Sequence, residues 1–246
     1  MKLFLKIVLG IIILLVVGLG YWRYDSSDRM HQVTPEALAA LQSDAAVSVN
    51  QDEWIVFTPA NASPTKGLIF YPGGECDERG YAEPLREIAA AGYLVVLVPM
   101  PLQLAVFAID SATDVIASFP EISSWAIAGH SLGGSMAARY TYDHPENIDG
   151  VLFWDAYAPD DMTDSAAKIM MIHRSDDSGA VPSDYLAKLP LLPQQTEFVA
   201  LNGAQHLNYG RFIAGRLYRD EPPAELNPDE QRTLAAAASI RFMEAL

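Results

Sequence analysis

The chain has 246 residues, half of them hydrophobic, and its 31 acidic residues outnumber its 16 basic ones, for a formal net charge of −15. So much negative charge repels the phosphates of nucleic acids, and we expect no nucleic-acid partner. The single cysteine, Cys76, excludes an intramolecular disulfide. Cysteine and histidine residues do not have the spacing of a zinc site, so we expect no metal and no cofactor.

The first 30 residues differ in composition from the rest of the chain. Lys2 and Lys6 precede the uncharged stretch 7–22, which ends in Tyr21-Trp22. A membrane-spanning helix needs about 20 apolar residues, and a lysine near its end can extend its stem toward the headgroups. Because positive charges favour the cytoplasmic side, we expect an uncleaved, single-pass anchor in the cell membrane, with the rest of the chain outside the cytoplasm.

A cleaved signal peptide is the alternative reading of this segment. Gly18 and Gly20 are small residues at a spacing suited to cleavage, and removal of the segment would yield a secreted protein. The absence of an alanine cleavage site favours the anchor. We therefore divide the chain into a membrane anchor or signal segment, 1–30, and one domain, 31–246.

The domain begins with edge elements and then alternates regularly. Thr34-Pro35-Glu36 indicates a short capped helix, and Val47–Val49 and Trp54–Phe57 indicate a hairpin at a sheet edge. The expected strands that follow are 67–71, 93–98, 124–128, 148–154, 168–172 and 196–201, and the expected helices are 81–91, 102–118, one from 135, 183–188 and 228–242. This alternation predicts an α/β fold with a mostly parallel sheet covered on both faces.

The most informative motif is Ala128–Gly134, AGHSLGG, which matches G-x-S-x-G. An apolar strand precedes it and a helix rich in small residues follows. A serine on such a tight strand-to-helix turn is forced outward beside a helix N-terminus. Gly129 and Gly133 are needed because a Cβ at either place would collide with the neighbouring strand or helix. We therefore predict a nucleophile elbow with Ser131 as the nucleophile.

A nucleophilic serine needs a base, and in the α/β-hydrolase fold the partners follow in the order serine, acid, histidine. His206 lies in a polar, glycine-bearing loop after the strand 196–201, where this base is expected. Chain order and position disfavour the other four histidines, His31, His130, His144 and His173. His206 is therefore the predicted general base.

The acid is expected after the strand 168–172, where Asp176 and Asp177 are adjacent. Hydrolases commonly have a G-x-x-D spacing here, which selects Asp177 and places Arg174 in the glycine position. The arginine departs from the pattern, so Asp176 stays open. Asp155, after the preceding strand, is a third candidate because some hydrolases have their acid there.

An oxyanion hole needs two backbone N–H groups aimed at the developing charge. Leu132, directly after the nucleophile, is expected to supply one. The strand 67–71 is followed by Pro72-Gly73-Gly74-Glu75, whose glycines allow close approach of the backbone to a substrate. Gly74 is the predicted second donor, with Glu75 as the alternative.

Together these segments resemble the α/β-hydrolases, in particular the small, lidless bacterial type called alpha/beta hydrolase fold-5. The resemblance rests on Tyr71–Gly74, Ala91–Val96, Val98–Pro101, Gly129–Gly134 and the segment around Asp177 and His206. It implies a serine hydrolase that acts through an acyl-enzyme, most commonly on a carboxylic ester as small-molecule substrate. An acyltransferase with the same triad, or a non-catalytic binding protein on this fold, are the alternatives.

Two intervals concern access to the site. Lids in this fold usually follow the strand that here ends at Trp154, and only residues 155–167 are available there, so we expect no large lid. The interval 207–226 contains several arginines and tyrosines and is a second candidate lining of the pocket.

Overall fold

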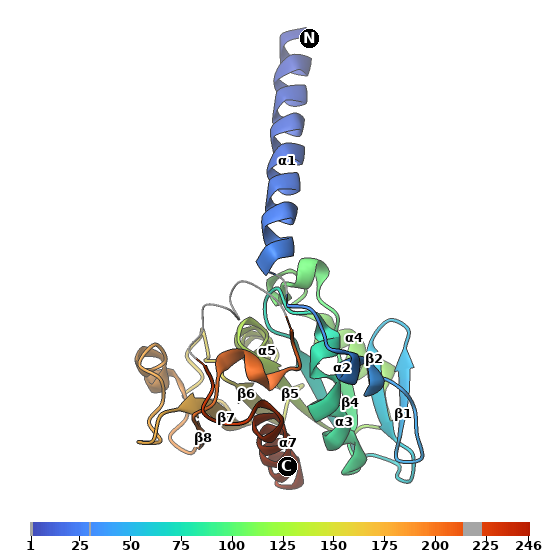
Figure 1. Cartoon of the computed structure of the whole chain (residues 1–246), viewed down its shortest axis with the longest axis vertical. Coiled ribbons are helices and arrows are strands. Elements are labelled where there is room, and N and C mark those ends of the chain that lie inside the picture. The colour runs from blue at the N-terminus through green and yellow to red at the C-terminus, as the bar shows by residue number, and fades with distance from the viewer. Residues whose placement is uncertain (1, 30, 214–222) are drawn as a thin grey trace.

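The structure is a computed structural model that describes residues 2–29, 31–213 and 223–246 (Figure 1). Among these residues, eight strands form one sheet in the order β1-β2-β4-β3-β5-β6-β7-β8. The strands are β1 Val47–Gln51, β2 Ile55–Pro59, β3 Lys66–Tyr71, β4 Leu94–Leu97, β5 Ser124–His130, β6 Gly150–Trp154, β7 Lys168–Ser175 and β8 Glu197–Asn202. Strands β1 and β2 form the expected antiparallel hairpin at one edge, and β4, β3, β5, β6, β7 and β8 pair in parallel.

The α-helices are α1 Lys2–Arg29, α2 Pro35–Ala39, α3 Ala82–Ala90, α4 Ser111–Ser118, α5 Leu132–Asp143 and α7 Pro228–Glu244. Among these described helices, α1 and α2 precede the first strand, α3, α4 and α5 lie between strands, and α7 follows the last strand. Short 3₁₀ turns are η1 Glu78–Tyr81, η2 Pro101–Gln103, η3 Ala105–Phe107, η4 Leu186–Leu191 and η5 His206–Tyr209. The α/β class with a doubly covered, mostly parallel sheet is thus confirmed.

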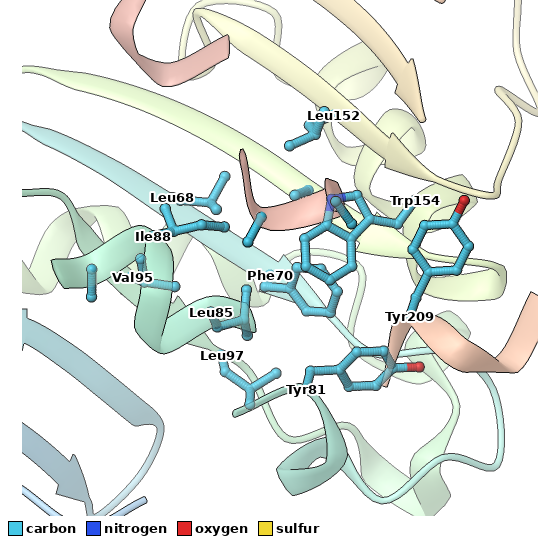
Figure 2. Packing of buried hydrophobic residues seen from close by; sticks show 14 of the residues in the cluster. Leu68, Phe70, Tyr81, Leu85, Ile88, Val95, Leu97, Leu152, Trp154 and Tyr209 are labelled. Atoms are coloured by element: carbon cyan, nitrogen blue, oxygen red, sulfur yellow. The ribbon is translucent and has the colours of Figure 1, made fainter. Parts of the chain in front are cut away.

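Two apolar layers cover the sheet because successive strand residues point to opposite faces. Leu68 and Phe70 of β3 pack with helices α3 and α7, and the alternating residues of the same strand pack with α4 and α5. Figure 2 shows Phe70 between Trp154 and Tyr81, and the rings of Phe70 and Trp154 lie 4.8 Å apart, edge to face. This packing fixes the carboxyl ends of β3, β5 and β6 against one another.

Two predicted helices differ from the structure. The helix expected over 102–118 begins only at Ser111, and residues before it form the 3₁₀ turns η2 and η3. Leu102 and Gln103 have positive φ angles of 55° and 58° there, which a continuous α-helix excludes. The helix expected over 183–188 is instead the 3₁₀ turn η4.

Helix α1 stands apart from the sheet (Figure 1). Its segment Phe4–Asp25 has 22 residues with a mean hydropathy of 2.6, and no part of the most apolar window is buried against the domain. The segment is long and apolar enough to cross a membrane, a property that membrane anchors and signal sequences share.

Candidate active site

Ser131 lies at the turn between β5 and α5, in a conformation that side chains rarely adopt. Its φ and ψ are 51° and −123°. The turn is tight because glycines flank it: a Cβ on Gly129 would lie 2.5 Å from the carbonyl carbon of Gly133, and a Cβ on Gly133 would lie 2.2 Å from the Tyr71 oxygen. Since these obstacles are backbone atoms, the geometry depends on both glycines. The hydroxyl of Ser131 lines a pocket at the surface.

His206 connects this serine to a buried carboxylate. Its Nε2 lies 3.0 Å from Ser131 Oγ, and its Nδ1 lies 2.5 Å from Oδ2 of Asp155. Asp155 directly follows β6, has a positive φ of 47°, and its side chain is fully buried. The structure therefore brings Ser131, His206 and Asp155 into one continuous line of hydrogen-bonding groups.

The two carboxylates favoured by sequence spacing lie elsewhere. Asp176 and Asp177 are exposed in the turn after β7, and Asp176 accepts a 2.9 Å hydrogen bond from the Ser178 N–H. In the described part of the chain, His206 Nδ1 forms a hydrogen bond with Asp155 and with neither Asp176 nor Asp177. The contacts of His206 therefore favour the third candidate, Asp155, over Asp177.

Strand order gives the physical reason why Asp155, and not Asp177, contacts His206. Strand β6 is the direct neighbour of β5, and the Ser131 N–H donates to the Trp154 carbonyl at 3.1 Å. The residue after Trp154 is therefore next to the nucleophile. Strand β7 is one strand further away, so Asp177 starts from a more distant position.

Arg174, which stands where the G-x-x-D spacing has glycine, contacts the buried carboxylate of Asp155. Its backbone N–H donates to Asp155 Oδ1 at 3.1 Å, and its guanidinium forms an ion pair with Oδ2. The same guanidinium contacts Asp184 and the Tyr185 hydroxyl, both at 3.0 Å. Tyr185 in turn donates to the Asp155 backbone oxygen at 2.8 Å. The sequence did not predict that Arg174 binds Asp155, although an arginine in place of the expected glycine was a visible departure.

These contacts determine the ionisation of Asp155. Burial by itself would raise the pKa of this carboxyl group. The hydrogen bond and charge of His206, followed by the charge of Arg174, outweigh burial and lower the pKa of Asp155 to about 2. The carboxylate is therefore ionised at neutral pH, as a partner for an imidazolium must be.

Two backbone N–H groups near Ser131 are candidates for an oxyanion hole. Leu132 is the first residue of α5, and a Cβ placed on Gly74 would lie 3.1 Å from the Leu132 side chain, so the two residues are adjacent. The Glu75 N–H is used by the Gln103 carbonyl, at 2.9 Å. Within the described part of the chain, the N–H groups of Gly74 and Leu132 have no hydrogen-bond acceptor. The geometry thus favours Gly74 over Glu75 as the second donor.

His130, which chain order disfavoured as a base, instead forms hydrogen bonds with the backbone of His206 and with Tyr81. Its Nε2 lies 2.8 Å from the His206 carbonyl oxygen, so this nitrogen carries the proton and donates. Tyr81 donates to His130 Nδ1 at 2.8 Å and accepts from the Gly73 N–H at 3.1 Å. Burial, followed by the charge of His206, lowers the pKa of His130 well below its usual value, which keeps the ring neutral. One chain of hydrogen bonds therefore connects the loop of Gly73 to the backbone of His206.

The pocket beside Ser131 has a volume of 1170 Å³. Its walls come from the segment after β7, the loop before η5 and the start of the segment before α7, and include Tyr157, Arg174, Tyr185 and Glu225. Residues 155–167 contain no helix or strand, as expected for a chain without a large lid. Segment 176–186 after β7 forms more of the wall than this interval does.

The interval 207–226 and Cys76 complete the description of the site's surroundings. In the interval 207–226, residues 223–225 line the pocket, whereas Arg211 pairs with Glu83, at 2.6 Å. Residues 214–222 lie outside the described part of the chain. Cys76 is buried, and burial raises the pKa of its thiol to about 12. This thiol is therefore not activated as a nucleophile.

Comparison with known proteins supports the same fold. The model of the Alpha/beta hydrolase family matches residues 67–227. A search of curated proteins returned no match. The matching structures include TT1662 from Thermus thermophilus, with 15% identity and a TM-score of 0.55, covering 81% of this chain and 97% of that one.

Two other matches have names that describe an activity. Ferulic acid esterase from Streptomyces cinnamoneus has 12% identity and a TM-score of 0.55, covering 76% of this chain and 68% of that one. Paleococcus ferrophilus monoacylglycerol lipase has 13% identity and a TM-score of 0.54, covering 75% and 96%. At these identities the likeness concerns the fold.

Proposed function

Because the chain belongs to the alpha/beta hydrolase family, we propose that it is a serine hydrolase with Ser131 as nucleophile, His206 as general base and Asp155 as acid. One observation carries the proposal: the hydroxyl, the imidazole and the buried carboxylate are in contact, at 3.0 Å and 2.5 Å. The carboxylate holds the imidazole in the tautomer that leaves Nε2 free to accept the serine proton.

The reaction follows from these positions. Ser131 Oγ attacks the acyl carbon of the substrate while His206 Nε2 takes its proton, and the carboxylate of Asp155 stabilises the resulting imidazolium. The N–H groups of Gly74 and Leu132 bind the oxyanion of the tetrahedral intermediate. The imidazolium then protonates the leaving group, which departs and leaves an acyl-enzyme. Water, deprotonated by His206, attacks the acyl-enzyme and releases the acid.

A carboxylic ester is the substrate class we propose. Two proteins of the same fold are named as a ferulic acid esterase and a monoacylglycerol lipase. The pocket admits a small-molecule acyl group because its wall combines the apolar Val181 and Leu186 with the phenols of Tyr157 and Tyr185.

Labelling of the full chain with a fluorophosphonate tests the nucleophile directly. We expect the wild type to be labelled and to hydrolyse p-nitrophenyl acetate, and Ser131→Ala to do neither. Ser183→Ala is the matched control because Ser183 is exposed and lines the same pocket; it should keep both properties. Labelling that persists in Ser131→Ala would overturn the assignment.

We further propose that α1 is an uncleaved anchor and that the domain lies outside the cytoplasm. The apolar segment Phe4–Asp25 supports a span, and Lys2 and Lys6 before its centre favour a cytoplasmic N-terminus. Protease added to intact spheroplasts should then digest the domain, and the N-terminal peptide should be recovered from the membrane fraction. A soluble product beginning near Tyr21 would indicate signal cleavage, and protection until lysis would indicate the reverse orientation.

A further inference from the structure

The polypeptide enters the domain beside the proposed active site. Helix α1 ends at Arg29, and two residues later the His31 N–H donates to the Glu75 carbonyl at 3.2 Å. Glu75 directly follows Gly74, one of the two proposed oxyanion donors. On the other side, the Gln32 carbonyl accepts from the Ile213 N–H at 2.9 Å. The end of α1 is therefore tethered at the carboxyl ends of the strands, where Ser131 also lies.

Four exposed apolar side chains lie on the two segments that are bonded to this point of attachment, the segment after β4 through Gln103 and the end of the segment after η5 through Ile213. Leu102, Val106 and Phe107 follow β4, and Leu102 and Phe107 are 55% and 60% exposed. The fourth side chain, that of Ile213, is also 60% exposed, and its N–H is bonded to Gln32, three residues after the end of α1. We call these four residues the mouth patch.

A backbone contact holds the first part of the mouth patch against the segment Pro72–Glu75, which contains the proposed oxyanion donor Gly74 and which we call the oxyanion loop. The Gln103 carbonyl accepts from the Glu75 N–H at 2.9 Å. Leu102, just before it, has a φ of 55°, a costly conformation for a residue with a Cβ, and its side chain stays exposed to solvent. Such outliers persist only where surrounding structure holds them in place. In Figure 1 the green segment after β4 lies beside the lower end of α1.

We propose that the mouth patch rests in the surface of the bilayer that α1 spans, so that the active site faces the membrane and takes an acyl ester from the lipid layer. The inference rests on the proposed function and defines its substrate class as a membrane-resident ester. Helix α1 fixes the distance of the domain from the bilayer, because only His31 and its neighbours separate the helix from the oxyanion loop.

The net charge of the protein indicates that it would bind a bilayer through apolar contacts and not through electrostatic attraction to the headgroups. With a formal net charge of −15, the chain is repelled by anionic headgroups. The four members of the mouth patch are all uncharged and apolar, and such side chains bind an interface through the apolar area they bury. A zwitterionic bilayer is therefore the appropriate partner for a test.

The first experiment compares two substrates with the full chain reconstituted in phosphatidylcholine vesicles. Phe107→Asp should lower hydrolysis of a long-chain ester dissolved in the bilayer by about tenfold, which is the effect of removing one aromatic side chain that the bilayer would bury. Hydrolysis of water-soluble p-nitrophenyl acetate should stay unchanged. Leu234→Asp is the matched control, because Leu234 is exposed on α7, away from α1; it should alter neither rate. Equal rates on the bilayer ester for wild type and Phe107→Asp would overturn the proposal.

The second experiment needs no catalysis. The native Cys76 is buried, so an environment-sensitive fluorophore can be attached to a cysteine introduced by Phe107→Cys, with Leu234→Cys as control. Spin-labelled lipids should quench the first fluorophore and not the second. Absence of quenching at both sites overturns the proposal even if fluorophosphonate labelling of the same samples is intact. Quenching without fluorophosphonate labelling would instead refute the proposed hydrolase function.

Discussion

Replacing Asp155 with asparagine should abolish most of the activity without unfolding the protein. The carboxylate is fully buried, and its Oδ2 lies 2.5 Å from His206 Nδ1. Asparagine keeps the shape but cannot hold the imidazole in the required tautomer or balance the imidazolium. The corresponding change in a characterised triad lowers kcat by about 10⁴, or about 5 kcal/mol of transition-state stabilisation.

The assay is kcat for p-nitrophenyl acetate with the full chain in detergent, combined with a thermal melt by circular dichroism. Asp177→Asn provides the matched control, since it makes the same chemical change on an exposed turn residue of the same pocket. Its kcat should stay within about twofold of the wild type, as is usual for surface substitutions. A severe loss in Asp177→Asn with a mild one in Asp155→Asn would refute the reasoning from geometry.

Three other substitutions or conditions test the surroundings of the triad. Arg174→Met removes one anchor of Asp155 but leaves the carboxylate, so kcat should fall by at most about 10²-fold, clearly less than in Asp155→Asn; an equal loss would contradict a positioning role. Gly133→Ala forces a Cβ to 2.2 Å from the Tyr71 oxygen, and chemical denaturation should show a loss of roughly 1–3 kcal/mol in unfolding free energy; unchanged stability would contradict the tight elbow. The lowered pKa of Asp155, about 2 against 3.8, stabilises the fold above pH 3.8 and is lost as pH falls toward 2. The stability difference between wild type and Asp155→Asn should therefore shrink by about 2 kcal/mol between pH 5 and pH 2; a difference independent of pH would contradict the ion pairs.

Where a local pattern determined the structure, the sequence was sufficient. The strand, the two glycines and the helix around Ser131 lie within a few residues of each other, and the structure has them as expected. The last helix was recognisable from its cap: Asn227 accepts hydrogen bonds from the N–H groups of Asp229 and Glu230, at 2.8 and 3.4 Å. Such features are independent of distant parts of the chain.

The segment 102–118 shows why other parts could not be predicted. Its apolar composition suits a helix, yet η2 and η3 interrupt it before Ser111. The Gln103 carbonyl accepts from Glu75, a residue 28 positions earlier in the chain, and this contact requires a backbone that an α-helix does not have. A tertiary contact with the segment after β3 thus overrides helix propensity here.

The position of the proposed acid, Asp155, likewise depends on a long-range feature, namely which strand end lies beside His206. Spacing within 173–177 could rank two adjacent aspartates, but it contained no information on which strand end lies beside His206. Arg174 was a signal that the spacing did not use. A glycine before the acid is a backbone requirement, whereas an arginine in its place adds a cation, and the described contacts pair this cation with two carboxylates, Asp155 at the neighbouring strand end and Asp184 later in the same segment. A partly buried charge needs a counter-charge, but only the three-dimensional arrangement shows that Asp155, the buried one of the two, also contacts His206.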